Sequence, residues 1–93
     1  MKKQPYPEDR LKALLDYIEE QEYVSGGWRR QSGGFANAEK VGHDEEYVDI
    51  TLRSGVESDN GSQVYTTHYK IRIEWLEYWA FTISEVYDRL EDT

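Results

Sequence analysis

The stretch Gln63–Leu90 has the clearest structural pattern in this chain. Up to Trp75, apolar and polar residues alternate, which is typical of a strand with one buried face. After Trp75 the apolar residues recur every three or four positions, which predicts an amphipathic helix continuing to Leu90. Its apolar face comprises Leu76, Trp79, Ala80, Ile83, Val86, Tyr87 and Leu90. We therefore expect a strand over Gln63–Trp75 that leads into a helix almost without a loop.

A second strand is predicted over Tyr47–Arg53, where Val48, Ile50 and Leu52 share one face. Between the two strands, Asn60-Gly61 is typical of a two-residue hairpin turn, because both residues tolerate positive φ. A turn longer by two residues would keep the same faces paired. The two-residue turn predicts the pairs Leu52–Tyr69, Ile50–Ile71, Val48–Ile73 and Asp49–Arg72.

Upstream, the sequence predicts one more helix and a short strand. Acidic residues after Pro7 and a stripe of Leu11, Leu14, Leu15 and Ile18 predict a helix that starts near Glu8 and ends by Tyr23 to Ser25, before Gly26-Gly27. Two Ser-Gly-Gly-aromatic tetrads follow, at 25–28 and 32–35. We interpret them as turns around a short edge strand near Trp28–Gln31.

These elements predict an α+β two-layer sandwich of order α-β-β-β-α, with an antiparallel three-stranded sheet and two helices on one face. Residues 1–7 are expected to form a flexible arm, and residues 8–93 a single domain. The element order resembles that of double-stranded-RNA-binding domains. Those domains begin their second helix with a lysine-rich cluster, whereas this chain has Glu74, Trp75, Leu76 and Glu77 there. The resemblance supports the fold and argues against RNA binding.

Composition narrows the class of partner. The formal net charge is −8 and the sequence pI is about 4.7, so direct binding to nucleic acid or to an anionic membrane is disfavoured. The chain has no cysteine, which excludes disulfides and thiolate catalysis. No segment is apolar enough to span a membrane or to act as a signal peptide. We therefore expect a soluble, cytoplasmic protein.

No residue pattern indicates catalysis or a cofactor. The run His43–Glu46 could offer metal ligands, but its spacing matches no known loop motif, so a solvated loop is the simpler interpretation. His68 has no Ser or Cys at the spacing of a nucleophile triad. The Ser-Gly-Gly turns next to Arg29 and Arg30 lack the Gly-Lys-Ser/Thr of a phosphate-binding loop. The sequence predicts no enzyme, no metal and no cofactor.

Two surfaces are candidates for partner binding. On the outer face of the predicted second helix, Tyr78 and Phe81 lie one turn apart within an acidic rim, as in many interfaces. The rim is formed by Glu74, Glu77, Glu85 and Asp88. Alternatively, the N-terminal arm or the Gly-rich segment covers these rings. The second surface is the outer sheet face, with Arg53, His68, Lys70 and Arg72, where ordinary cross-strand pairing is the simpler interpretation.

The favoured hypothesis is a protein-binding inhibitor or adaptor whose carboxylates imitate nucleic-acid phosphates and enter a basic groove on another protein. In size and charge the chain resembles small phage or plasmid proteins that block restriction or CRISPR enzymes. One alternative is a structural subunit that self-associates, for example as a homodimer. Another is a nucleic-acid binder that uses the basic sheet face together with Arg29 and Arg30.

Overall fold

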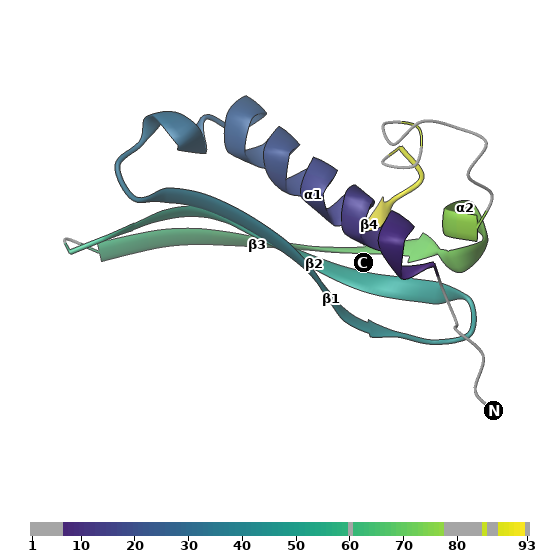
Figure 1. The fold of residues 1–93 in the computed structure, drawn as a ribbon. Coiled ribbons are helices and arrows are strands. Elements are labelled where there is room, and N and C mark those ends of the chain that lie inside the picture. The colour runs from purple at the N-terminus through teal and green to yellow at the C-terminus, as the bar shows by residue number, and fades with distance from the viewer. Residues whose placement is uncertain (1–6, 60, 78–84, 86–87, 93) are drawn as a thin grey trace.

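The computed structural model describes residues 7–59, 61–77, 85 and 88–92, and it confirms the α+β fold (Figure 1). Its sheet is antiparallel with the order β1-β2-β3-β4, and both helices lie on one face. The two-residue strand β4 was not predicted. The elements are α1 (Glu8–Ser25), η1 (Trp28–Arg30), β1 (Gly34–His43), β2 (Tyr47–Ser58), β3 (Gly61–Arg72), α2 (Ile73–Glu77) and β4 (Glu91–Asp92).

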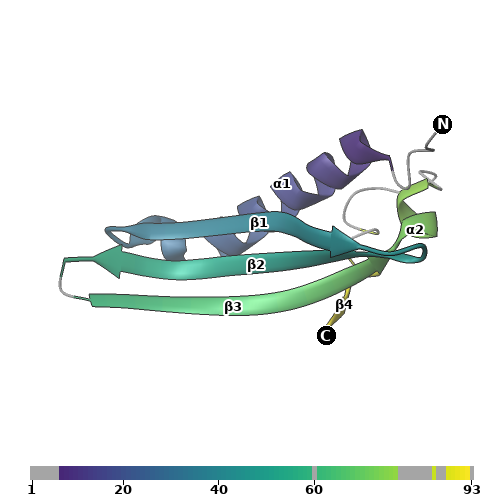
Figure 2. The same cartoon turned by 90° about the horizontal axis from the view of Figure 1, so that it is seen from below.

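Helix α1 forms as predicted. Glu8 and Asp9 occupy its first turn, where acidic side chains complement the positive end of the helix dipole. It ends at Ser25, and the N–H of the capping residue Gly26 donates to the carbonyl oxygen of Glu22 at 2.9 Å. Figure 2, a view from below, shows α1 displaced toward β1 and away from β3. The helix thus covers one side of the sheet and lies next to its β1 edge.

The core lies between α1, α2 and the sheet. The alternation in β2 is confirmed, since Val48, Ile50 and Leu52 are all buried. Leu15 is half-buried and packs against the margin of the core. The buried hydrophobic residues are Leu11, Leu14, Ile18, Ala38, Val48, Ile50, Leu52, Ile71, Ile73 and Leu76.

The strand predicted near Trp28–Gln31 is wrong, because this segment forms the 3-10 helix η1. Gly27 adopts a φ of 86° and reverses the chain after α1. The N–H of Arg30 then donates to the carbonyl of Gly27, and the indole N–H of Trp28 donates to Glu22 Oε2 at 2.8 Å. These local hydrogen bonds compete with an extended backbone.

The third long strand is β1, Gly34–His43, which the sequence did not predict in this place. It is an edge strand, and Ala38 is its only buried residue among the described positions. A bulge between Lys40 and Gly42 also shifts its register against β2. An edge strand with one buried side chain has too weak an alternation to be identified from its sequence.

The predicted hairpin register was wrong by two residues. Ser58 pairs with Gly61, so the turn lies one residue earlier than Asn60-Gly61. A register shift of two residues keeps every side chain on the same face of the sheet, so core-facing residues of β2 still lie opposite core-facing residues of β3. The observed pairs are Val48–Ile71, Ile50–Tyr69, Leu52–Thr67, Asp49–Lys70 and Tyr47–Arg72.

Helix α2 follows β3 directly, and the absence of a loop is confirmed. The predicted end of the strand at Trp75 is wrong, because β3 ends at Arg72 and Ile73 already begins the helix. Most of the predicted helix, from 78 to 84 and at 86 and 87, lies outside the described residues. Its predicted end at Leu90 is wrong. Asp88 and Arg89 form a turn, and Glu91 pairs with Lys70 of β3, because the terminal residues add a short strand to the sheet.

Glu22 joins α1 to η1 and β2. Its Oε2 accepts hydrogen bonds from the Trp28 indole at 2.8 Å and from the hydroxyl of the buried Ser54 at 3.0 Å. We expect Glu22→Ala to lower the free energy of unfolding by about 1–3 kcal/mol, because it leaves a buried hydroxyl without its acceptor. Urea unfolding measures this loss. Glu20→Ala, at an exposed site on the same helix, should change stability by less than about 0.5 kcal/mol, and an equal loss in both variants would contradict the assignment.

Candidate functional site

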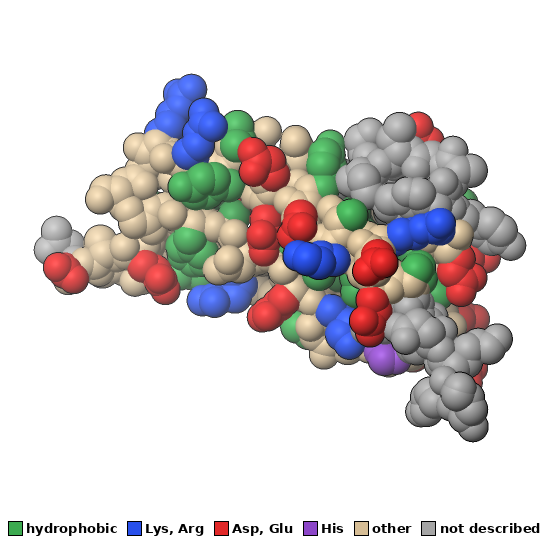
Figure 3. Space-filling model, viewed as in Figure 1, with side chains coloured by type: hydrophobic (Ala, Val, Ile, Leu, Met, Phe, Trp, Pro, Cys, Tyr) green, Lys and Arg blue, Asp and Glu red, His purple; other side chains and the backbone are tan. Residues whose placement is uncertain are grey.

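Acidic side chains are spread over the visible face of the molecule (Figure 3), and those of three separate segments line hollows at the end that carries α2. The N-terminus of α1 and Glu77 line one hollow, and the β1–β2 turn lines another together with α2. We call this surface the acidic end. It consists of Glu8, Asp9, Asp44, Glu45, Glu46, Glu74 and Glu77.

One backbone hydrogen bond and the side chain of Arg10 hold these segments together. The N–H of Ile73 donates to the carbonyl of Glu46 at 2.8 Å and joins α2 to the β1–β2 turn. The guanidinium of Arg10 donates to the carbonyls of Leu76, at 3.0 Å, and Glu77, so it joins α1 to the end of α2. Arg10 therefore satisfies two backbone carbonyl groups of α2. The carboxylates are thereby placed on a fixed scaffold.

Asp44 shapes the turn within the acidic end. Its Oδ1 accepts the N–H of Tyr47 at 2.7 Å and the N–H of Glu46 at 2.8 Å. These two hydrogen bonds stabilise the charged form and lower the pKa of Asp44 below its ordinary value, with smaller contributions from the charges of Lys70 and His43. The carboxylate consequently stays ionised well into the acidic range.

The lowered pKa of Asp44 predicts a pH-dependent contribution to stability. A depressed folded pKa stabilises the fold above the unfolded value of about 3.9, and this stabilisation disappears as the pH falls through the folded pKa. The difference in stability between wild type and Asp44→Ala, measured by urea unfolding, should therefore be largest near neutral pH. It should shrink as the pH falls below about 4 and through the folded pKa, to the part that an uncharged acceptor retains. Asp44→Asn keeps an acceptor without the charge, so its difference from Asp44→Ala should not vary with pH. A wild-type advantage over Asp44→Ala that persists unchanged at low pH would contradict this role.

The structure places only part of the predicted partner surface. Glu74 and Glu77 are exposed on α2, and they line one hollow together with Glu45, Glu46 and Arg72. Glu85 and Asp88 are exposed on the segment that follows residues 78–84. Tyr78 and Phe81, the proposed aromatic centre, lie outside the described residues. The structure therefore describes the four acidic residues of the rim, while the aromatic centre of the surface stays a prediction.

Sequence reasoning missed five members of the acidic end: Glu8, Asp9, Asp44, Glu45 and Glu46. The sequence pattern predicts a helix-dipole role for Glu8 and Asp9 and a solvated loop for the run His43–Glu46. Their common location depends on β1, which brings the turn after it next to α2. Without that strand, no sequence signal placed these residues beside Glu74.

The basic residues of the outer sheet face are engaged with neighbouring side chains, but not as predicted. Arg72 lies opposite Tyr47 and not Asp49, and its guanidinium is 5.1 Å from the centre of that ring. Lys70 Nζ lies 4.3 Å from the same ring centre. Cations over an aromatic face are attracted by its quadrupole. The other contacts are Arg53 over Phe35 at 5.9 Å and His68 Nδ1 to Thr51 Oγ1 at 3.4 Å.

Within residues 7–59, 61–77, 85 and 88–92, no group of three or more His, Asp or Glu side chains is arranged to hold a metal ion. No helix in that part of the chain is long and apolar enough to cross a membrane. Among protein-family models, curated proteins and solved structures, none matches this chain. The function must therefore be argued from the surfaces themselves.

Proposed function

We propose that this protein is a small acidic binding protein, an inhibitor or adaptor without catalytic activity, and that its acidic end occupies a basic groove on a partner. The gathering of carboxylates from α1, the β1–β2 turn and α2 at one end supports this proposal. In a nucleic-acid-binding partner, such a groove normally receives phosphates. The acidic end offers fixed negative charges in their place.

The physical basis is electrostatic complementarity. A protein with a net charge of −8 is attracted to a basic partner over distances near the Debye length, about 10 Å at 0.1 M salt. At contact, carboxylates held by a rigid backbone replace the phosphates that the groove was built to accept. A restriction or CRISPR enzyme of a host cell would be blocked in this way by a phage- or plasmid-type protein.

Affinity capture tests the proposal. Immobilised wild-type protein is exposed to a nuclease-treated host lysate, and the retained proteins are identified. We expect a nucleic-acid-binding protein that duplex DNA displaces from the resin, because the two anions compete for one groove. A retained partner that excess DNA does not displace would contradict the mimicry.

A second candidate function is nucleic-acid binding through the basic sheet face. It is favoured by the position of Lys70 and Arg72 around Tyr47 on the opposite side of the sheet from the core residues Val48 and Ile71. A gel shift at low salt with single- and double-stranded probes decides between the candidates. Retardation of a probe would favour this function over mimicry, and unretarded probes would dismiss it.

A further inference from the structure

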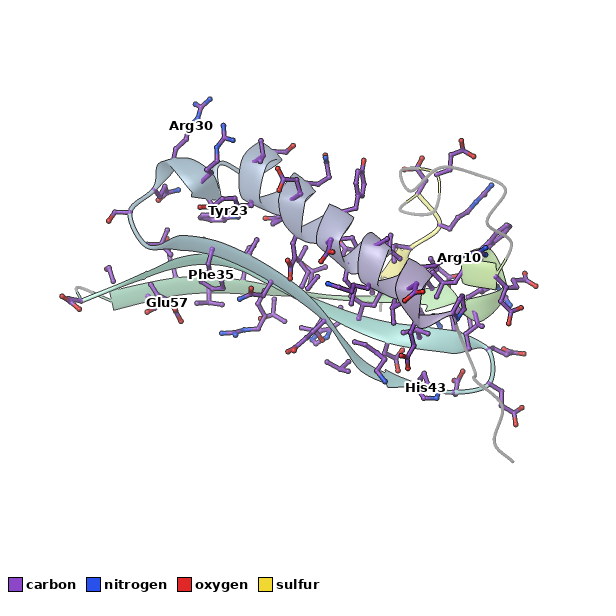
Figure 4. All side chains as sticks on the ribbon, in the orientation of Figure 1. Arg10, Tyr23, Arg30, Phe35, His43 and Glu57 are labelled. Atoms are coloured by element: carbon purple, nitrogen blue, oxygen red, sulfur yellow. The ribbon has the colours of Figure 1, made fainter. Side chains whose placement is uncertain are left out.

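A groove of about 460 Å³ runs between the C-terminal half of α1 and the outer edge of β1. It lies away from the acidic end, toward the end of the molecule where η1 and Arg30 are found (Figure 4). Tyr23 on the helix contributes aromatic surface to it, whereas the ring of Phe35 contacts Arg53 on the outer sheet face. Its lining is Asp16, Glu19, Glu20, Tyr23, Gly34, Phe35 and Ala36.

The backbone of β1 presents hydrogen-bonding groups to this groove. β1 is the first strand in the sheet order, and its other edge pairs with β2. The N–H of Gly34 donates to Gln31, and the N–H of Ala38 donates to Glu19 Oε2 at 2.8 Å, so both groups point away from β2. Because the direction of these groups alternates along an antiparallel strand, Ala36 directs its N–H and C=O out of the sheet as well. An added strand could pair with it.

The charge of the groove favours an added strand that carries basic side chains. Asp16, Glu19 and Glu20 form an acidic wall on α1 directly beside the edge, in which Asp16 also pairs with Lys12 at 3.5 Å. Lys or Arg side chains on an incoming segment would meet carboxylates, whereas acidic segments would be repelled. The half-buried ring of Tyr23 offers a contact to an apolar side chain or to the aliphatic stem of a lysine.

We propose that this groove binds an extended basic segment of a partner protein, which adds to the sheet by pairing with Ala36 and places a Lys or Arg side chain against the acidic wall. The mode is strand addition, in which backbone hydrogen bonds supply affinity and side-chain pockets supply specificity. This site is separate from the acidic end, and it does not depend on the function proposed there.

A second copy of the chain fits the groove less well. Pairing β1 with β1 of another copy would bring two acidic walls toward the same edge, and like charges repel. The Ala38 N–H is also already satisfied by Glu19, which protects part of the edge from a second sheet. Charge complementarity therefore favours a basic partner segment over self-association.

Peptide binding tests the charge requirement. The probe is a fluorescently labelled peptide that alternates Lys and Val, measured by anisotropy. Asp16→Lys/Glu20→Lys should weaken binding about tenfold, whereas Glu74→Lys/Glu77→Lys, with the same change in net charge, should stay within about twofold. Equal weakening by both pairs would overturn the proposal, since net charge alone would then explain the binding.

Amide hydrogen exchange on the wild-type protein tests strand addition directly. Saturating Lys-Val peptide should protect the amide of Ala36 and leave that of Val41, further along the same strand, unchanged. A peptide that alternates Lys and Pro has the same charge but fewer backbone donors, and it should bind weakly. Equal binding of the two peptides, or an unprotected Ala36 amide at saturation, would overturn strand addition. Protection of Ala36 without peptide in a dimer detected by light scattering would assign the edge to a second copy instead.

Discussion

Ile71→Ala is expected to lower the free energy of unfolding by about 2–5 kcal/mol, because it removes a fully buried side chain from the centre of the core. Ile71 pairs with Val48 on β2, and both side chains have no exposed surface. The rigid sheet cannot close around the cavity. For a small domain with a total stability of about 5–15 kcal/mol, this is a large share.

Urea denaturation of wild type and Ile71→Ala measures this loss. Val64→Ala serves as the control, since Val64 lies on the same strand but is partly exposed. Its expected cost is below about 1 kcal/mol. If the two substitutions cost the same, Ile71 does not occupy the core position that the register assigns to it.

Gly55→Ala is expected to destabilise the protein by about 3 kcal/mol or more, because backbone strain and a steric clash act together. Gly55 lies in the middle of β2 with a φ of 152°. A Cβ at this position would collide with the backbone carbonyl of Gln63 on β3. Since both groups belong to paired strands, the clash can be relieved only by separating β2 from β3.

Gly61→Ala separates the two causes. Gly61 also has a positive φ, of 129°, but a Cβ there would meet nothing within 4 Å. Its replacement should therefore cost only the backbone strain, about 1–2 kcal/mol. Thermal or urea unfolding of both variants gives the comparison. A Gly55→Ala protein as stable as Gly61→Ala would contradict the close approach of β2 and β3 at that point.

Hydrophobic periodicity was sufficient to predict the elements that face the core. The stripe of α1 and the alternation of β2 each place several apolar side chains on one face, so the pattern is strong. Periodicity does not distinguish registers that differ by two residues, and this is why Ile50 was paired with Ile71 instead of Tyr69. In the Gly-rich segment the conformation depends on hydrogen bonds such as that from Trp28 to Glu22, which no local pattern reveals.

The candidate site was predictable only in part, for a related reason. Glu74 and Glu77 follow from the helix pattern, but their acidic neighbours come from segments distant in the sequence. The groove beside α1 could not be predicted at all, since Ala36 belongs to a strand with little hydrophobic signal. Segments with a weak hydrophobic pattern cannot be placed in the tertiary structure from the sequence alone.

The most direct test of the acidic end is the affinity of the captured partner for two charge-matched double variants at low and high salt. Glu74→Lys/Glu77→Lys alters the acidic end, whereas Glu39→Lys/Glu57→Lys makes the same charge change at exposed sites outside it. Glu57 lies at the far end of the sheet (Figure 4). We predict that the first pair weakens binding at least about tenfold and reduces its salt dependence, while the second stays within about twofold of wild type. Equal losses in both pairs, or wild-type affinity for Glu74→Lys/Glu77→Lys, would contradict the role of the acidic end.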